Sequence, residues 1–357
     1  MTPDLLPAVL AEPERMRALS PPQWERLIRQ ARKSQLIARV ALVCQERGWL
    51  PEIAERPRLH LEAALRQCAW RRRAARHEVD CLRRALKGAN VSVILLKGAA
   101  YDLAELPLAR GRLYSDIDIM VPRERIRDVE AALGAFGWFP QAYDPYDQRF
   151  YREWMHEIPP LQHIIRRTEM DIHHTITPPV SRYRVDAKRL WQAARPLEME
   201  GRFFVLSPPD MVLHSIVHLF QEGEFEQGLR DVVDVADLVA HFGREPGFWQ
   251  ELIDRAEELR LGRLLYYAVQ QIRRVFDRVL PADFVAAVDR FGPGGAFGSA
   301  MNWLFSMALV ADLSGGGRLS TDLARRVLYL RGHCLRMPVR LMVPHLVRKA
   351  WRRNFAT

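Results

Sequence analysis

Two aspartates, Asp116 and Asp118, are the residues of this sequence whose type and spacing point most directly to chemistry. Around them, apolar residues at 117, 119 and 121 alternate with Asp116, Asp118 and Met120. This period of two is typical of a strand with one face on a core, so both carboxylates project from the other face, ~6.5 Å apart. Two such acids repel each other unless a cation lies between them, and Mg²⁺ suits carboxylate and phosphate oxygens alike. A solvated strand face is the alternative.

The residues upstream favour the phosphate interpretation. The apolar run 91–96 predicts a strand that ends at Lys97 and Gly98, and residues 101–106 predict a short helix before Pro107. A strand that leads through a glycine into a helix places backbone N–H groups where a phosphate can lie. Lys97 or Arg112 can add positive charge. A tight turn at Gly98 and a solvated Lys97 are the alternatives.

A third acid, Asp171, lies in residues 168–176, where polar and apolar residues again alternate. Asp171 and His173 share one face of this predicted strand. If the strand pairs beside the one that carries Asp118, Asp171 completes a cluster of three carboxylates. Such a cluster can hold two metal ions ~3.5–4 Å apart for phosphoryl chemistry.

Taken together, these residues resemble a known family. The similarity rests on Leu95-Leu96-Lys97-Gly98, Arg112, residues 115–121 and Asp171-Ile172-His173. This combination resembles the uncharacterised bacterial nucleotidyltransferase family of the polymerase-beta-type superfamily. Residues 207–218 and 228–238 are similar to the two helices after the catalytic core of that family. The similarity extends over roughly residues 55–245.

The resemblance implies an α+β fold, with a small mixed β-sheet nucleotidyltransferase core flanked by helices. It implies that Asp116, Asp118 and Asp171 are catalytic and bind Mg²⁺ or Mn²⁺, with Asp171 positioning or deprotonating the attacking hydroxyl. The nucleoside triphosphate, expected to be ATP, would contact a set of four residues. These are Lys97, Gly98, Arg112 and Ser115.

The implied reaction moves a nucleoside monophosphate to a hydroxyl of an acceptor and releases pyrophosphate. The sequence leaves the acceptor open among a small molecule, a protein side chain and an RNA end. Two positions depart from the family pattern, since Ala99 replaces a serine or glycine and Asp171 stands where glutamate is frequent. The alternative is therefore a catalytically weak nucleotide- or RNA-binding regulatory protein.

We expect three regions in the 357 residues, since this length with 48% hydrophobic residues can fill more than one packed unit. They are an N-terminal helical region (1–88) with breaks near residues 49–51 and at Pro57, the nucleotidyltransferase core (89–206), and a C-terminal helical domain (207–357) with a basic tail. Residues 143–160 predict a loop and edge region near the site.

Several features favour a cytoplasmic protein. No stretch approaches ~20 uninterrupted apolar residues, and the N-terminus lacks the basic start of a secretory signal. The four cysteines have no metal-site spacing, which is consistent with a reducing compartment.

The net charge of +10 is distributed unevenly. The arginine-rich stretch 59–87 predicts a solvated helix face, with a groove for a polyanion as the alternative. From Arg325 onward there are nine Lys and Arg and no acid. This tail predicts a helix packed on the body, or a weak contact with an anionic membrane or with RNA.

Two polar pairs on the predicted C-terminal helices have less specific patterns. His214 and His218 have the i, i+4 spacing of a metal pair but lie among core-like residues, so we expect packing. Asp231 and Asp234 beside Arg230 predict ion pairs within one helix, with a role for Arg230 at the triphosphate as the alternative.

Overall fold

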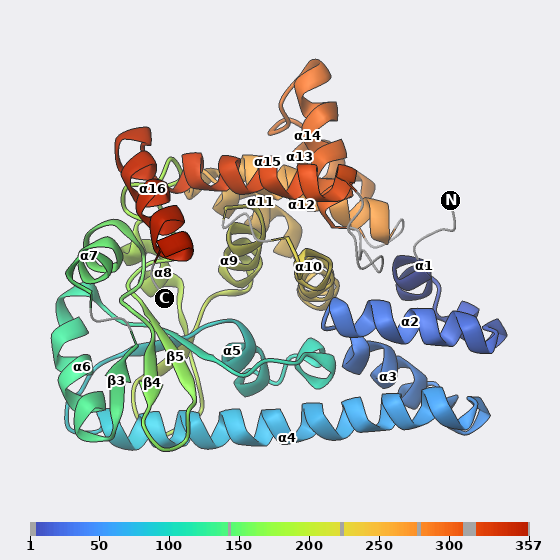
Figure 1. Cartoon of the computed structure of the whole chain (residues 1–357), viewed down its shortest axis with the longest axis horizontal. Helices are drawn as coiled ribbons and strands as arrows, with labels where there is room; N and C mark the ends of the chain where they lie inside the picture. Colours follow the sequence, from blue (N-terminus) through green and yellow to red (C-terminus); the bar gives the residue numbers. More distant parts are fainter. Residues whose placement is uncertain (1–4, 142–143, 222–224, 277–279, 310–318, 356–357) are drawn as a thin grey trace.

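The computed structural model describes residues 5–141, 144–221, 225–276, 280–309 and 319–355, without the side chains of 349, 350 and 352–355. Its strands form one sheet, and helices precede, flank and follow that sheet (Figure 1). The predicted α+β class, with a mixed sheet between helical regions, is confirmed. None of the described helices is long and apolar enough to cross a membrane.

Within the described residues the sheet has seven strands, in the order β3-β4-β5-β2-β1-β7-β6. They are β1 (Val93–Leu95), β2 (Ile117–Met120), β3 (Trp138–Pro140), β4 (Leu161–His163), β5 (Glu169–His173), β6 (Arg195–Pro196) and β7 (Phe203–Val205). Parallel pairing joins β2 to β5 and β1 to β7, whereas the other neighbours are antiparallel. The predicted strands at 91–96, around Asp116 and Asp118, and at 168–176 are confirmed as β1, β2 and β5.

The helices before and between the strands are α1 (Leu5–Ala11), η1 (Pro13–Ala18), α2 (Pro21–Lys33), α3 (Ile37–Glu46), η2 (Leu50–Glu52), α4 (Glu55–Leu86), α5 (Lys97–Leu103), η3 (Pro107–Gly111), η4 (Arg123–Arg125), α6 (Ile126–Ala135), α7 (Pro145–Arg149), the π-helix η5 (Phe150–Trp154) and α8 (Ala187–Ala193). After the sheet come α9 (Pro208–Gln221), α10 (Gly228–Phe242), α11 (Phe248–Glu258), α12 (Gly262–Val275), α13 (Ala282–Asp289), α14 (Gly295–Ala308), α15 (Leu319–Arg336) and α16 (Val339–Phe355).

One local prediction is wrong and another is right only in part. The region 143–160 is predicted as a loop and edge region, but α7 and η5 occupy residues 145–154. Residues 155–160 form no helix or strand, and Glu157 among them makes an isolated β-bridge; Tyr143 lies outside the described residues. Pro57 does not break a helix, because it lies in the first turn of α4, where a proline costs no intrahelical hydrogen bond.

The long helix α4 connects two hydrophobic cores. Its first half contributes Leu61, Ala64 and Cys68 to a core with α1, α2 and α3, and its second half contributes residues from Ala75 to Leu86 to the core of the sheet. Figure 1 shows α4 along the lower edge of the molecule, beneath α2 and α3 at one end and the strands at the other. Residue 88 therefore follows a helix that serves both parts, and the division at 88 and 206 stays a prediction.

Two arginines of α4 are not simply solvated, in contrast to the prediction. Arg72 and Arg76 both donate to the carboxylate of Asp102, which is fully buried on α5. Burial alone would raise the pKa of Asp102, but the two guanidinium groups outweigh it and lower that pKa. These bonds hold α5, which begins at Lys97, against α4.

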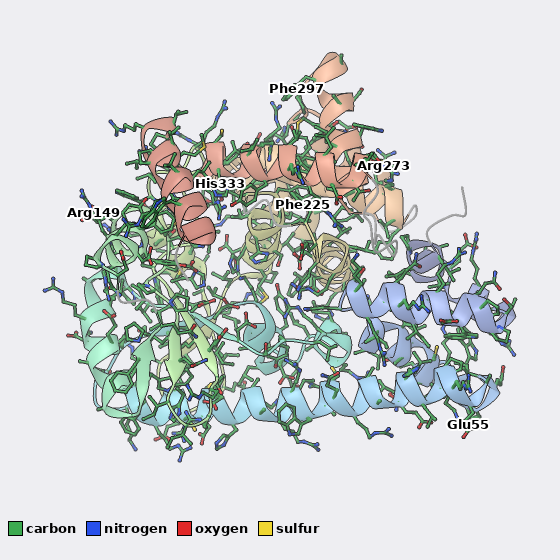
Figure 2. The ribbon with its side chains drawn as sticks, in the orientation of Figure 1. Glu55, Arg149, Phe225, Arg273, Phe297 and His333 are labelled. Atoms are coloured by element: carbon green, nitrogen blue, oxygen red, sulfur yellow. The ribbon has the colours of Figure 1, made fainter. Side chains whose placement is uncertain are left out.

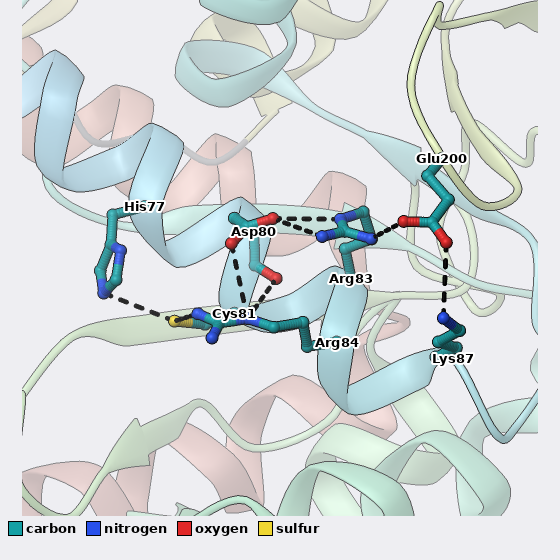
Figure 3. Close-up of polar contacts among 7 residues, drawn as sticks. All are labelled: His77, Asp80, Cys81, Arg83, Arg84, Lys87 and Glu200. Carbon is teal, nitrogen blue, oxygen red and sulfur yellow. Dashed lines mark hydrogen bonds and ion pairs between the residues drawn. The ribbon is translucent and has the colours of Figure 1, made fainter.

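Near its C-terminal end α4 carries a more exposed network (Figure 3). Arg83 donates to Asp80 on the same helix and pairs with Glu200, which Lys87 also approaches at 3.5 Å. The loop before β7 is thereby tethered to α4.

The C-terminal tail forms helices that pack on the body. The ring of His345 on α16 stacks on Phe150 with centroids 4.2 Å apart, and Arg348 pairs with Asp144 at 2.9 Å. The first part of α16 therefore lies against α7 and η5, as Figure 1 also shows.

Candidate active site

Parallel pairing of β2 with β5 brings the three predicted carboxylates together. Asp118 lies directly opposite Asp171 in the register, and Asp116 immediately precedes β2. One carboxylate oxygen from each of the three lies within 4.8 Å of the others. The prediction that these two strands are neighbours is confirmed.

The three acids differ in their surroundings. Asp116 is exposed, Asp118 is 4% exposed, and Asp171 is intermediate. Burial raises the pKa of Asp171 to about 7, and the negative charges of Asp118 and Glu157 add to the rise. At neutral pH the metal-free Asp171 is therefore only partly ionised.

Two groups hold Asp118 in its charged form. Lys97 Nζ lies 3.5 Å from Asp118 Oδ1, and His173 Nε2 lies 3.4 Å from the same oxygen. Burial opposes the charge, but Lys97 and His173 outweigh it and hold the pKa of Asp118 below its ordinary value. Asp118 is thus an ionised carboxylate within the site.

This donor set fits a hard divalent cation. It consists of carboxylate oxygens, the ligands that Mg²⁺ and Mn²⁺ prefer. Burial is the largest cause of the raised pKa of Asp171, and repulsion from Asp118 and Glu157 adds to it. A divalent ion between the three carboxylates would remove that repulsion.

A cleft of about 1210 Å³ opens beside the acids. Of the predicted site residues, Lys97, Arg112, Ser115, Asp116 and Asp118 line it, whereas Gly98 and Asp171 do not. Further cations line it from other elements: Arg71 of α4, Arg230 of α10, and Arg325 and Arg326 of α15. Phe225, labelled in Figure 2, is one of its aromatic residues, so both a polyanion and a ring could be accommodated.

Lys97 and Gly98 have different structural roles at the start of α5. The left-handed backbone conformation lies at Lys97, with φ of 44°, and not at the glycine. A Cβ on Gly98 would lie 2.5 Å from Cγ of Tyr114 and 2.8 Å from Nη1 of Arg112. Gly98 is therefore required by the side chains that pack over it, one of which is the predicted nucleotide ligand Arg112.

The side chain of Arg112 is 9% exposed and is paired. Its Nε donates to Asp234 at 2.7 Å, and its guanidinium lies over the rings of Tyr101 and Tyr114. Burial would lower the pKa of Arg112, but Asp234 outweighs it and the pKa rises. Asp234 thus fixes Arg112 at the cleft from α10.

Of the two ion pairs predicted within α10, the one of Asp231 is confirmed and the one of Asp234 is wrong. Asp231 pairs with Arg230 at 2.8 Å, as expected, and also faces His218 at 3.6 Å. Asp234 instead reaches across to Arg112. A partner on another element leaves no trace in local spacing, so Asp234 could not have been assigned from the sequence. His214 is buried, in agreement with packing.

Glu157 is a further residue that sequence reasoning missed. It pairs with His173 through an antiparallel bridge and lies 3.6 Å from that ring. Its segment follows a π-helix, which no hydrophobic period signals. His156 lies in the region 143–160, for which the sequence predicts a position near the site.

Comparison of the chain with curated proteins and with solved structures found no match. Residues 20–277, well over half of the chain, match the model of a family described as uncharacterised nucleotidyltransferase. The match includes the strands, the three acids and the helices α9 and α10, and it confirms the family resemblance seen in the sequence. The chain therefore belongs to this nucleotidyltransferase family.

Proposed function

We propose that this protein transfers a nucleoside monophosphate from a nucleoside triphosphate to a hydroxyl of an acceptor. ATP is the expected triphosphate. The observation that carries the proposal is the convergence of Asp116, Asp118 and Asp171 beside a cleft with cationic walls. Membership of a nucleotidyltransferase family supports the same reaction class.

The acids would hold Mg²⁺ or Mn²⁺, which when bound offsets the negative charge of the triphosphate oxygens. Lys97 and Arg112 lie on the cleft wall, where their charges attract the triphosphate. Ser115 is exposed there and can donate a hydrogen bond. Gly98 acts indirectly, by leaving room for Arg112 and Tyr114.

Asp171 would orient the acceptor hydroxyl and take its proton. In the metal-free protein, burial raises the pKa of Asp171 to about 7. A bound cation would lower this pKa, so that Asp171 would be ionised at neutral pH and able to accept the proton. The acceptor oxygen forms a bond to the α-phosphorus, and the bond from that phosphorus to the bridging oxygen of the β-phosphate breaks. Pyrophosphate leaves with the electron pair of the broken bond.

The cleft leaves room for an acceptor. Its volume of about 1210 Å³ exceeds the ~300–1000 Å³ of typical small-molecule pockets, so a nucleotide need not fill it. The acceptor can be a small molecule, a protein side chain or an RNA end.

The metal and nucleotide assignment is tested with Asp116→Asn combined with Asp118→Asn. We expect calorimetry to show Mg²⁺-dependent ATP binding by the wild type and none by the double variant. Asp128→Ala, which removes an exposed acid on α6, serves as the control and should bind as the wild type does. Equal ATP affinity in the wild type and the folded double variant would contradict the assignment of Asp116 and Asp118 as metal ligands.

A catalytically weak nucleotide- or RNA-binding regulator is the second candidate. It is favoured by Ala99, which is 1% exposed and supplies no hydroxyl after Gly98. ATP labelled at the α-phosphate, incubated with Mg²⁺ and cell extract, distinguishes the two. Label transfer with pyrophosphate release supports the enzyme, whereas tight ATP binding without either supports the regulator.

A weak contact with an anionic membrane, through α16, is also proposed. Val339, Val343, Val347 and Trp351 recur every four residues and are each at least half exposed, and Arg340 is exposed beside them. Apolar and basic groups on one helix favour an anionic lipid surface. Co-sedimentation with anionic but not neutral vesicles would support this contact, and retention of RNA instead would replace it.

A further inference from the structure

A second set of possible metal ligands lies next to the three acids. His156 and Glu157 follow η5, and His173 ends β5. One ligand atom of each lies within 4.8 Å of the others. These ligands are two imidazoles and one carboxylate, so their chemistry differs from that of the all-carboxylate cluster.

The backbone holds the three residues together. His174 N donates to His156 O at 2.8 Å, and Ile158 N donates to Ile172 O at 3.0 Å. The antiparallel bridge between Glu157 and His173 lies between these two bonds. Backbone hydrogen bonds therefore fix the positions of these three residues relative to one another.

Two buried nitrogen atoms of these histidines lack partners in the part of the chain that the structure describes. His156 and His173 are 8% and 2% exposed, and the Nδ1 atom of each has no hydrogen-bond partner among the described residues. Glu157 Oε2 lies 3.6 Å from His173 Nδ1, too far for a hydrogen bond. A buried polar atom without a partner costs about 1–3 kcal/mol, so two of them on one small site point to a missing ligand.

The other nitrogen of His173 fits this interpretation. His173 Nε2 lies 3.4 Å from Asp118 Oδ1, where its N–H can be donated to the carboxylate. Metal-binding histidines commonly donate their second nitrogen to a carboxylate in this way, and the Nδ1 lone pair is then left for the ion. Of the charged neighbours, Glu157 and Asp118 favour a cation, whereas Lys97 and Arg336 oppose it.

We propose that His156 Nδ1, Glu157 and His173 Nδ1 bind a second divalent cation. The cation belongs to the borderline-soft class, of which Zn²⁺ is the preferred candidate. Imidazole with carboxylate suits Zn²⁺ and Co²⁺, whereas Mg²⁺ prefers oxygen ligands alone. The ion would hold the His173 ring and, through it, Asp118. The site stands on its own geometry and does not depend on nucleotidyl transfer.

The test uses Co²⁺, which reports its ligands by visible absorption, on the full chain after removal of metals with a chelator. We expect one equivalent of Co²⁺ to bind in the presence of excess Mg²⁺ and to be displaced by Zn²⁺. His156→Gln and Glu157→Gln should each weaken Co²⁺ binding by at least ~10-fold. Glu157 is the more exposed of the two, so its variant remains informative if His156→Gln does not fold.

Two controls locate the ion. Asp116→Asn alters only the acid cluster, and His77→Gln removes a surface histidine that contacts Cys81 (Figure 3). Both should bind Co²⁺ as the wild type does. Loss of Co²⁺ binding in Asp116→Asn, displacement by Mg²⁺, or unchanged binding in folded Glu157→Gln would overturn the proposal. Because the readout is Co²⁺ absorption, a failure to bind ATP would affect only the proposed function.

Discussion

Asp171 and Asp118 occupy one register position on neighbouring strands, yet their surroundings give them different protonation behaviour. Asp118 has Lys97 and His173 as partners, whereas Asp171 faces Asp118 and Glu157. The carboxylate with cationic partners is suited to bind a metal, and the one with acidic neighbours is suited to accept a proton. This difference leads to the first prediction.

Asp171→Asn should lower turnover by ~10²–10⁴ while ATP affinity stays within a few-fold, because a general base is lost from a nearly isosteric side chain. Steady-state rates and calorimetry on the same preparation measure both. Glu169→Gln, at an exposed position on the same strand, is the matched control and should retain activity. If affinity and turnover fall together, Asp171 acts mainly as a metal ligand.

Gly98→Ala should destabilise the protein by about 1–3 kcal/mol, because the new methyl group would meet the buried Tyr114 ring at 2.5 Å. Urea denaturation measures the change. Gly134→Ala has open space and lies within α6, so there we expect a gain of about 0.5–1 kcal/mol. Equal stability of Gly98→Ala and wild type would show that the Tyr114 ring moves aside easily.

At the scale of elements, the position of α5 depends on a buried charge. Asp102 is 0% exposed and receives Arg72 and Arg76 from α4, with the Tyr114 hydroxyl at 3.3 Å. The helix α5, which starts at Lys97, is therefore positioned by Arg72 and Arg76 of α4. The sequence predicts that this face of α4 is solvated.

Asp102→Ala should cost about 3 kcal/mol or more, because it leaves two guanidinium groups partly buried without their carboxylate. Asp80→Ala removes the exposed partner of Arg83 on the same helix and should cost under about 1 kcal/mol. Denaturation midpoints of the two variants measure the contrast. Similar losses in both would mean that water replaces Asp102 at little cost.

A second contact between elements joins α10 to α3, and it predicts a pH dependence. Asp237 pairs with Arg39 at 2.7 Å, but burial outweighs this pair and raises the pKa of Asp237 to about 6 from an ordinary value of 3.8. The folded state therefore binds the proton more tightly, so this contribution to stability is present at low pH and is lost as pH rises through about 6.

Asp237→Asn has no such titration. The stability of the variant relative to wild type should thus increase between pH 4 and pH 7.5. The upper limit of this increase is about 3 kcal/mol, and solvent screening reduces it because the Asp237 side chain is 22% exposed. Urea denaturation across this pH range measures the difference. Parallel profiles for the two proteins would contradict the raised pKa.

At the scale of the whole molecule, one wall of the cleft comes from α15, a helix late in the chain. Arg325, Arg326, Tyr329 and Leu330 of α15 line the same cleft as Lys97 and Asp118. Figure 1 shows α15 running horizontally through the upper half of the molecule, above α9 and α10 in this view. The family match ends at residue 277, so this wall lies outside the part of the chain that the family model covers.

Arg326→Ser should weaken ATP binding by about 2–5-fold at low salt, and the difference should shrink at high salt, because an exposed charge acts through a screened field. Arg340→Ser removes an exposed charge from α16 that does not line the cleft and should bind ATP as the wild type does. Calorimetry at two salt concentrations measures both variants. Equal affinities for Arg326→Ser and wild type would place the triphosphate away from α15.

The sequence by itself determined the elements whose signals are local. The period of two around Asp118 and Asp171 predicts β2 and β5, and the long helical period predicts α4. The spacing of Asp116 and Asp118 places both acids at one strand. By contrast, β3, β4 and β6 are two or three residues long, and no period can be read over so few residues.

Only the tertiary structure decided which distant residues meet. It pairs Arg112 with Asp234, places Asp102 between Arg72 and Arg76, and brings His156 and Glu157 beside His173. It also gives Lys97 a left-handed backbone conformation, which no local pattern in the sequence signals. Such contacts follow from how helices and strands pack on one another, and the spacing of residues within a single element carries no record of that packing.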